Sequence, residues 1–126
     1  MIVPDWGGYL EFREGLVSAL DPRFYSQDWL DLEILEGRAH FMRTEKAAIV
    51  FRFKQYPTGW TELRSVAATG DLEQIRQMLI PIAEGAAAKL GCKSARITSR
   101  PAWVRLMPDY YQYQVVMEKD LADGQF

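Results

Sequence analysis

The stretch of residues 70–92 reads GDLEQIRQMLIPIAEGAAAKLGC and shows the longest helical pattern in the chain. Its apolar residues recur every three or four positions, which predicts one long amphipathic helix that starts after Gly70-Asp71 and ends at Gly91. These apolar residues are Leu72, Ile75, Met78, Leu79, Ile82, Ala83, Ala86, Ala87 and Leu90. Pro81 lies inside the pattern, and because proline has no N–H we expect a kink there.

Two shorter helices are predicted on the N-terminal side, over residues 6–20 and 27–36. Apolar residues keep helical spacing in the first helix until Asp21-Pro22, where the proline ends it. Ser26 is a suitable N-cap for the second helix, and Gly37 is placed to close it. The chain is therefore expected to open with two helices.

Three strands are predicted between these helices and the long one, over residues 39–43, 47–53 and 60–66, where the hydrophobic period changes to two. Thr44-Glu45 and Tyr56-Pro57-Thr58-Gly59 form short connections between them, and the second contains the proline and glycine typical of a hairpin loop. We expect the three strands to pair as an antiparallel meander.

The chain after the long helix is predicted to form a strand over residues 93–99, a short helix over 101–107 and a last strand over 111–118. In that last strand Tyr111, Tyr113, Val115 and Met117 share one face. Two strands joined through a helix favour parallel pairing. The predicted order is ααβββαβαβ, an α/β domain with a mixed sheet and helices on both faces.

The composition is that of one globular domain over residues 1–126, with loose ends at 1–7 and 120–126. Fifteen basic residues against seventeen acidic ones give a net charge of −2, which disfavours bulk binding to nucleic acid or to anionic membranes. No apolar run is long enough to span a bilayer, and Cys92 is the one cysteine. We therefore expect a cytoplasmic protein with a buried, unreactive thiol.

The element order, together with Ala87-Ala88-Lys89-Leu90-Gly91-Cys92 before a strand, resembles the GNAT N-acetyltransferase superfamily over about residues 8–119. Within it, the chain looks similar to small phage and prophage proteins. The stretches that carry this second likeness are Gly37-Arg38-Ala39, Tyr56-Pro57, Gly70-Asp71-Leu72 and Arg100-Pro101-Ala102-Trp103. The resemblance implies a phage or prophage setting, in which the protein is cytoplasmic or associated with the virion.

Active enzymes of this superfamily bind acyl-CoA through a Q/R-x-x-G-x-G/A loop, where backbone amides at a helix start hold the pyrophosphate. The counterpart here, residues 66–72, reads VAATGDL, with one glycine, no Gln or Arg, and the carboxylate of Asp71 at the helix start. The resemblance also implies that Leu106 stands where many of these enzymes have a tyrosine acid. We therefore expect that the cofactor site is lost and that no cofactor is bound.

Six residues are candidates for a site. Glu62 is a candidate general base and Tyr110 a candidate general acid, in roles that the resemblance implies; a solvent-facing strand carboxylate is the alternative for Glu62. Arg96, Arg100, Trp103 and Arg105 form a candidate cluster for a phosphate, a carboxylate or a partner. The alternative is a strand-to-helix turn in which the tryptophan anchors the helix.

The one histidine and the two tryptophans of the opening helices do not indicate a particular function. His40 has no Cys, Asp or Glu at metal-binding spacing. We expect its side chain to lie on the surface of a strand or to be half-buried with its polar atoms satisfied. Trp6 and Trp29 are interface or core residues of the opening helices.

Two hypotheses follow. In the first, a GNAT-like domain without an acyl-CoA loop acts without catalysis, through a protein partner or self-association. In the second, the chain is an N-acetyltransferase that uses acetyl-CoA in an atypical pocket.

Overall fold

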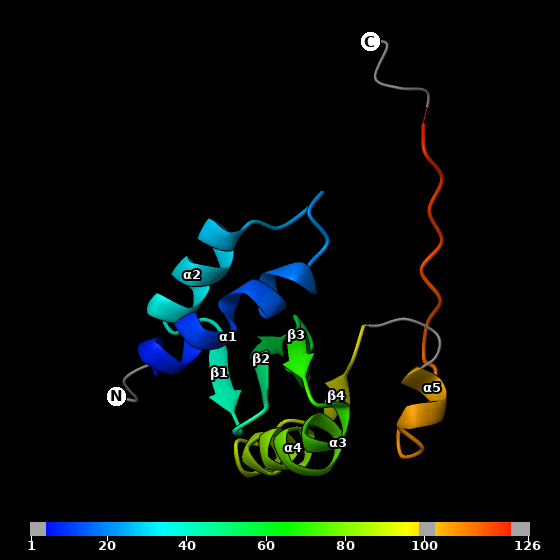
Figure 1. Ribbon diagram of the computed structural model, residues 1–126. Coiled ribbons are helices and arrows are strands. Elements are labelled where there is room, and N and C mark those ends of the chain that lie inside the picture. Colours follow the sequence, from blue (N-terminus) through cyan, green and yellow to red (C-terminus); the bar gives the residue numbers. More distant parts are fainter. Residues whose placement is uncertain (1–4, 99–102, 122–126) are drawn as a thin grey trace.

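The computed structural model describes residues 5–98 and 103–121 as one sheet with helices on both sides (Figure 1). The elements in chain order are α1 (Trp6–Ser18), α2 (Gln27–Leu35), β1 (His40–Arg43), β2 (Ala47–Gln55), β3 (Thr61–Gly70), α3 (Leu72–Gln74), the π-helical turn η1 (Ile75–Leu79), α4 (Ile80–Lys89), β4 (Ser94–Arg96) and α5 (Trp103–Leu106). None of the helices in these residues is long and apolar enough to cross a membrane.

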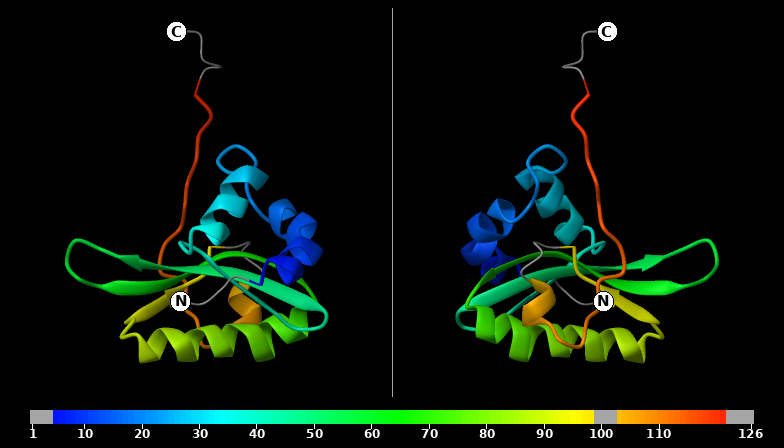
Figure 2. Two further views of the ribbon diagram at one scale, coloured as in Figure 1. Left: turned by 90° about the vertical axis from the view of Figure 1, so that its left-hand side faces the viewer. Right: turned by 90° about the vertical axis from the view of Figure 1, so that its right-hand side faces the viewer.

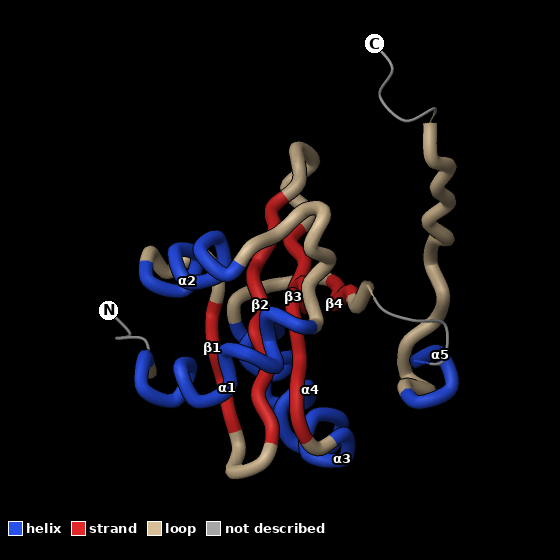
Figure 3. The backbone as a smooth tube through the Cα atoms, turned by 45° about the horizontal axis from the view of Figure 1, so that its top comes forward, coloured by secondary structure: helices blue, strands red, loops and turns tan. Residues whose placement is uncertain are grey.

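The sheet is mixed, with strand order β1-β2-β3-β4 (Figure 3). The pairs β1–β2 and β2–β3 are antiparallel, as the meander predicted, and β3 pairs with β4 in parallel. The parallel ladder is short: it joins only Glu62–Arg64 to Ser94–Arg96. The predicted mixed α/β architecture is confirmed.

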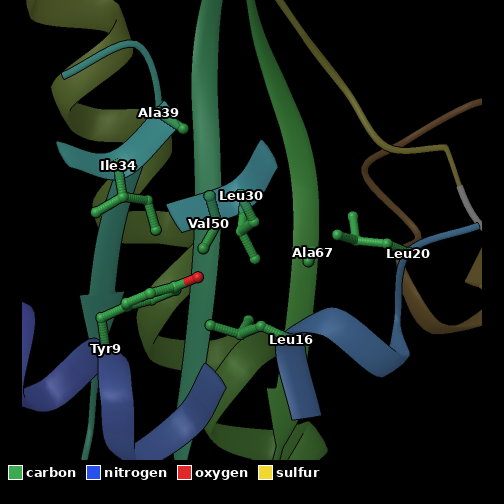
Figure 4. Packing of buried hydrophobic residues seen from close by; sticks show 8 residues of the cluster. All are labelled: Tyr9, Leu16, Leu20, Leu30, Ile34, Ala39, Val50 and Ala67. Carbon is green, nitrogen blue, oxygen red and sulfur yellow. The ribbon is translucent and has the colours of Figure 1, made fainter. Parts of the chain in front are cut away.

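Each face of the sheet is covered by a different layer of helices, with α1 and α2 on one side and α3, η1 and α4 on the other (Figure 2). In the first layer Tyr9 and Leu16 of α1 and Leu30 of α2 are fully buried against Val50 of β2 (Figure 4). In the second, apolar residues of η1 and α4 pack on β2 and β3, with Cys92 half-buried at the edge of the cluster. Burial of these apolar side chains is the main stabilising contribution to the fold.

The long helix is continuous but changes its winding before Pro81. In η1 the backbone hydrogen bonds join residues five positions apart, and the Ile80 N–H donates to the Ile75 carbonyl. Pro81 then lies in the first turn of α4, where its missing N–H is tolerated. The distortion predicted at Pro81 therefore takes the form of a π turn on its N-terminal side.

Several boundaries differ from the sequence prediction. β4 covers only Ser94–Arg96 of the strand predicted over residues 93–99. β3 does not end at Val66 but continues to Gly70, so that Asp71 alone connects the strand to the long helix. At the N-terminus, Trp6 and Gly7 form the first turn of α1 and are not a loose end, because the Asp5 side chain accepts a hydrogen bond from the Gly8 N–H at 3.0 Å.

The prediction of a last strand over residues 111–118 is wrong in this structure. Residues 111–121 are extended and have no ladder partner among the described residues, and they lie outside the layers of sheet and helices (Figure 1). The apolar side chains are exposed, with Tyr111 at 81% and Met117 at 89%. Alternation creates a face suited to a sheet, but without a neighbouring strand the segment does not become one.

Candidate functional site

A cleft opens where β3 and β4 part. Their ladder stops at Arg64 and Arg96; β3 continues to Gly70, whereas the chain after Arg96 leaves the sheet. Val66 is an extra residue on β3, because Phe51 pairs with Ser65 while Val50 pairs with Ala67. Such a bulge increases the local twist of a strand and helps to turn it away from its neighbour.

The cleft encloses about 370 Å³ and its walls are mostly apolar. Ile75 and Ile80 line it from the long helix, Ala67 from β3 and Trp103 from α5. The polar side chains on its lining are Ser18, Ser65, Arg96, Thr98 and Tyr110. An apolar hollow with a few polar groups is typical of a site for a small ligand or for an apolar side chain of a partner.

Tyr110 is the best-defined polar group on this lining. Its hydroxyl donates a hydrogen bond to a carboxylate oxygen of Glu84 on α4. Burial, reinforced by this hydrogen bond, raises the pKa of Tyr110 above its usual value, so the phenol stays protonated. The backbone nearby is held by the Arg76 Nε, which donates to the Leu106 carbonyl at 2.8 Å.

Glu62 lies beside the start of the cleft but is not free to act on a ligand. Its side chain is 3% exposed, and it accepts hydrogen bonds from the Tyr56 hydroxyl at 3.0 Å and the Arg64 Nε at 3.3 Å. Its other oxygen lies 3.3 Å from the Arg96 Nε. The expected alternative of a solvent-facing carboxylate is therefore wrong, and the buried charge is stabilised by two guanidinium groups.

The predicted arginine and tryptophan cluster is only partly assembled. Arg96 and Trp103 both line the cleft, whereas Arg105 is exposed on α5 and is not part of the lining. Arg100 lies outside the described residues. Trp103 also packs against the cluster under the sheet, as the alternative of a tryptophan that anchors the helix predicted.

His40 is half-buried and packs on side chains of the sheet, as predicted. Its ring lies 5.5 Å from the Phe51 ring and 5.4 Å from the Phe53 ring, centroid to centroid. Burial lowers the pKa of His40 because the charged imidazolium is disfavoured there. Over the described residues no three His, Cys, Asp or Glu side chains lie together in a way that suits a metal ion.

The start of the long helix is filled by residues of the chain itself. The Asp71 side chain accepts from the Gln74 N–H at 3.0 Å, and the Asp71 N–H donates to the Lys46 carbonyl at 2.9 Å. The Gln74 side chain in turn accepts from the Lys46 N–H at 3.2 Å and from the Thr44 hydroxyl. The turn between β1 and β2 therefore lies directly against the helix start.

The sequence interpretation missed Tyr56 and Arg64 as partners of Glu62. The signal was present, because Arg64 stands two residues from Glu62 on one strand and therefore on the same face. Tyr56 could be found only through the hairpin register, in which Lys54 pairs with Glu62.

The arrangement of elements is similar to that of known acetyltransferase structures. A ribosomal-protein-alanine N-acetyltransferase from Brucella melitensis biovar Abortus 2308 superimposes with a TM-score of 0.59, at 11% identity, over 90% of this chain and 94% of that one. An acetyltransferase from Trypanosoma brucei gives 0.58 at 14% identity, over 93% of each chain. A point mutant of TTHA1254 from Thermus thermophilus gives 0.59 at 11% identity, over 90% and 93%.

The chain has the GNAT fold. No protein-family model matches the sequence, and no curated protein matches it either. Identities of 11–14% to the GNAT-fold structures establish the arrangement of the backbone and not the activity, which depends on the residues of the site.

Proposed function

We propose that this chain is a GNAT-fold domain that binds a protein partner and does not transfer acyl groups from coenzyme A. The observation that carries the proposal is the closed start of the long helix. A pyrophosphate there would meet the Asp71 carboxylate and the turn at Thr44–Lys46, instead of bare amides. The residues present do not fit this part of the cofactor.

The state of Glu62 supports the same proposal. A general base must reach the proton that it removes and must be free to accept it. Glu62 is enclosed by Tyr56, Arg64 and Arg96, and both of its carboxylate oxygens are already engaged. These contacts connect β3 to β4 beside the start of the cleft and leave neither carboxylate oxygen free to accept a proton from a substrate.

The test is a calorimetric titration with acetyl-CoA up to millimolar concentration, accompanied by an assay for thiol release with peptide and polyamine acceptors. We expect no saturable heat, no thermal stabilisation and no thiol release. An active acetyltransferase measured in parallel shows that the reagents work. A dissociation constant in the micromolar range would contradict the proposal.

The second candidate is an N-acetyltransferase with an atypical pocket, and the open cleft is the observation that favours it. Within the described residues, strand pairing does not close the cleft and Leu72 is not on its lining, while Tyr110 stands there as a protonated acid. In that case Tyr110→Phe would abolish thiol release and leave acetyl-CoA binding intact. The partner-binding proposal does not depend on the phage or prophage setting that the sequence resemblance implies.

A further inference from the structure

Three arginines form a row across the sheet. Arg52 of β2 pairs with Arg64 of β3, and Arg64 pairs with Arg96 of β4. Residues directly opposite each other on neighbouring strands have their side chains on the same face. The row therefore presents three guanidinium groups side by side, with neighbouring strands about 4.8 Å apart.

A second row lies two residues along the strands, on the same face. It consists of Lys54, Glu62 and Ser94, which pair in the same register. Tyr56 and Trp60 complete this surface, because Tyr56 donates to Glu62 at 3.0 Å and the Trp60 Nε1 donates to the Ser94 hydroxyl at 2.9 Å. We call these eight residues the arginine face: Arg52, Lys54, Tyr56, Trp60, Glu62, Arg64, Ser94 and Arg96.

The charges on the arginine face do not balance. Like charges directly opposite each other destabilise a sheet. Glu62 compensates Arg64 and Arg96, but it is the one carboxylate on this face against four basic residues. The Arg52 Nε is buried and has no hydrogen-bond partner within the described residues. The surplus is local, since the whole chain has a net charge of −2.

The arginine face is partly exposed: Trp60 is exposed, Glu62 is buried, and the other six residues are half-buried. The layer of α1 and α2 packs over Val50 and Ala67, farther along the same strands, whereas the β2–β3 hairpin extends beyond that layer (Figure 2). The side chains of Arg64 and Arg96 are each 34% exposed. Tyr113 of the extended C-terminal segment is the one described ring that lies over Arg96, at 5.7 Å.

We infer that the arginine face binds an acidic, extended segment of a protein partner, an inference that rests on the proposed function. Guanidinium groups bind carboxylates through paired hydrogen bonds. Within the chain, the Glu62 carboxylate already lies against the guanidinium groups of Arg64 and Arg96. Alternate residues of an extended peptide are about 7 Å apart, and Arg52 and Arg96 are two strand spacings, about 10 Å, apart. The spacing of acidic side chains at alternate positions of a bound segment lies between this distance and the spacing of neighbouring arginines, about 5 Å, and long, flexible arginine side chains reach over such a difference.

The neighbouring aromatic residues fit a protein partner better than a nucleic acid. Tyr, Trp and Arg are the residues enriched at the energetic centres of protein interfaces, and Trp60 is 46% exposed beside the row.

The test measures fluorescence anisotropy with a labelled decapeptide in which glutamate alternates with serine, and with a labelled single-stranded decathymidylate. The variants are Arg52→Glu and Arg96→Glu, with Arg105→Glu as the matched charge reversal on exposed α5. We expect saturable micromolar binding of the peptide that weakens about tenfold or more in the first two variants and less than about twofold in the third. Arg52→Gln and Arg96→Gln keep the result interpretable if a charge reversal unfolds the protein.

Three outcomes overturn the inference. They are the absence of saturable peptide binding, an equal loss with Arg105→Glu, and tighter binding of the decathymidylate that the same variants abolish. Each outcome is independent of the acetyl-CoA titration. Cofactor binding would contradict the proposed function alone, and loss of peptide binding without cofactor binding would contradict the arginine face alone.

Discussion

Gly70 occupies a backbone conformation that residues with a side chain rarely adopt. Its φ is +102°, and a Cβ atom there would lie 2.2 Å from the Lys46 carbonyl oxygen. The obstacle is backbone on the adjacent turn, so it cannot be relieved by a side-chain rotation. We expect Gly70→Ala to lower the free energy of unfolding by roughly 2–4 kcal/mol, as measured by urea denaturation.

Gly85 provides the matched control. It lies in the interior of α4, and a Cβ atom there would meet nothing within 4 Å. Alanine has a higher helix propensity than glycine, so Gly85→Ala should raise the free energy of unfolding by about 0.5–1 kcal/mol. Equal effects of the two substitutions would show that the turn at Lys46 does not press against Gly70.

His40 should make stability depend on pH. Burial between phenylalanine rings lowers its pKa, so the folded protein holds fewer protons at this site than the unfolded chain does. Its stabilising contribution is therefore present above the unfolded pKa of 6.5 and is lost as the pH falls below that value. In urea titrations between about pH 7.5 and 5.5, wild type should lose stability relative to His40→Gln. Parallel curves would contradict this.

Pro81 determines how the long helix winds. It is exposed on α4, and the π turn η1 directly before it accommodates a ring that would clash in a regular helix. Pro81→Ala restores an N–H and removes the ring, so we expect the free energy of unfolding to rise by about 1–3 kcal/mol, less than the full cost of proline in a regular helix. Thermal and urea unfolding followed by circular dichroism measure this. A loss of stability would mean that the π turn is required by the packing of Ile75 and Leu79.

The elements that sequence predicted well are those whose signals are local. Ser26 accepts the Trp29 N–H at 3.1 Å as an N-cap, and Gly37 and Gly91 have positive φ, at the ends expected for their helices. The end of β3 was misplaced because the residues after Val66 extend as a strand only by pairing with β2. That pairing depends on contacts distant in sequence, and a single sequence does not display them.

The candidate site shows the same division between what is local and what is not. Glu62 was placed correctly on the strand before the long helix, and Asp71 correctly at the helix start. The burial of Glu62 beneath two arginines came from three strands that meet in register, and the row of Arg52, Arg64 and Arg96 arises in the same way. The sequence thus identified the charged residues of the candidate site, whereas the topology of the sheet determined which of them are in contact.

At the scale of the whole molecule, the C-terminal segment contributes little to the folded body in this structure. Residues 111–121 touch the body through Tyr113 over Arg96, and through Glu118, which lies 2.7 Å from Arg23. Both contacts are exposed, and exposed ion pairs and cation–π contacts add little stability. The apolar face that the sequence assigned to a sheet is covered by none of the described residues.

Truncation after Tyr110 tests this separation. Tyr110 itself stays, because its hydrogen bond to Glu84 holds the chain against α4. With only exposed contacts removed, we expect Tm to change by less than about 4 °C and the circular dichroism spectrum to keep its shape. A fall of about 10 °C or more would mean that the alternating residues of the segment are buried as a strand in solution. The same truncation also tests whether Tyr113 competes with the acidic peptide for Arg96. If it does, truncation should tighten peptide binding, because the ring no longer lies over that guanidinium.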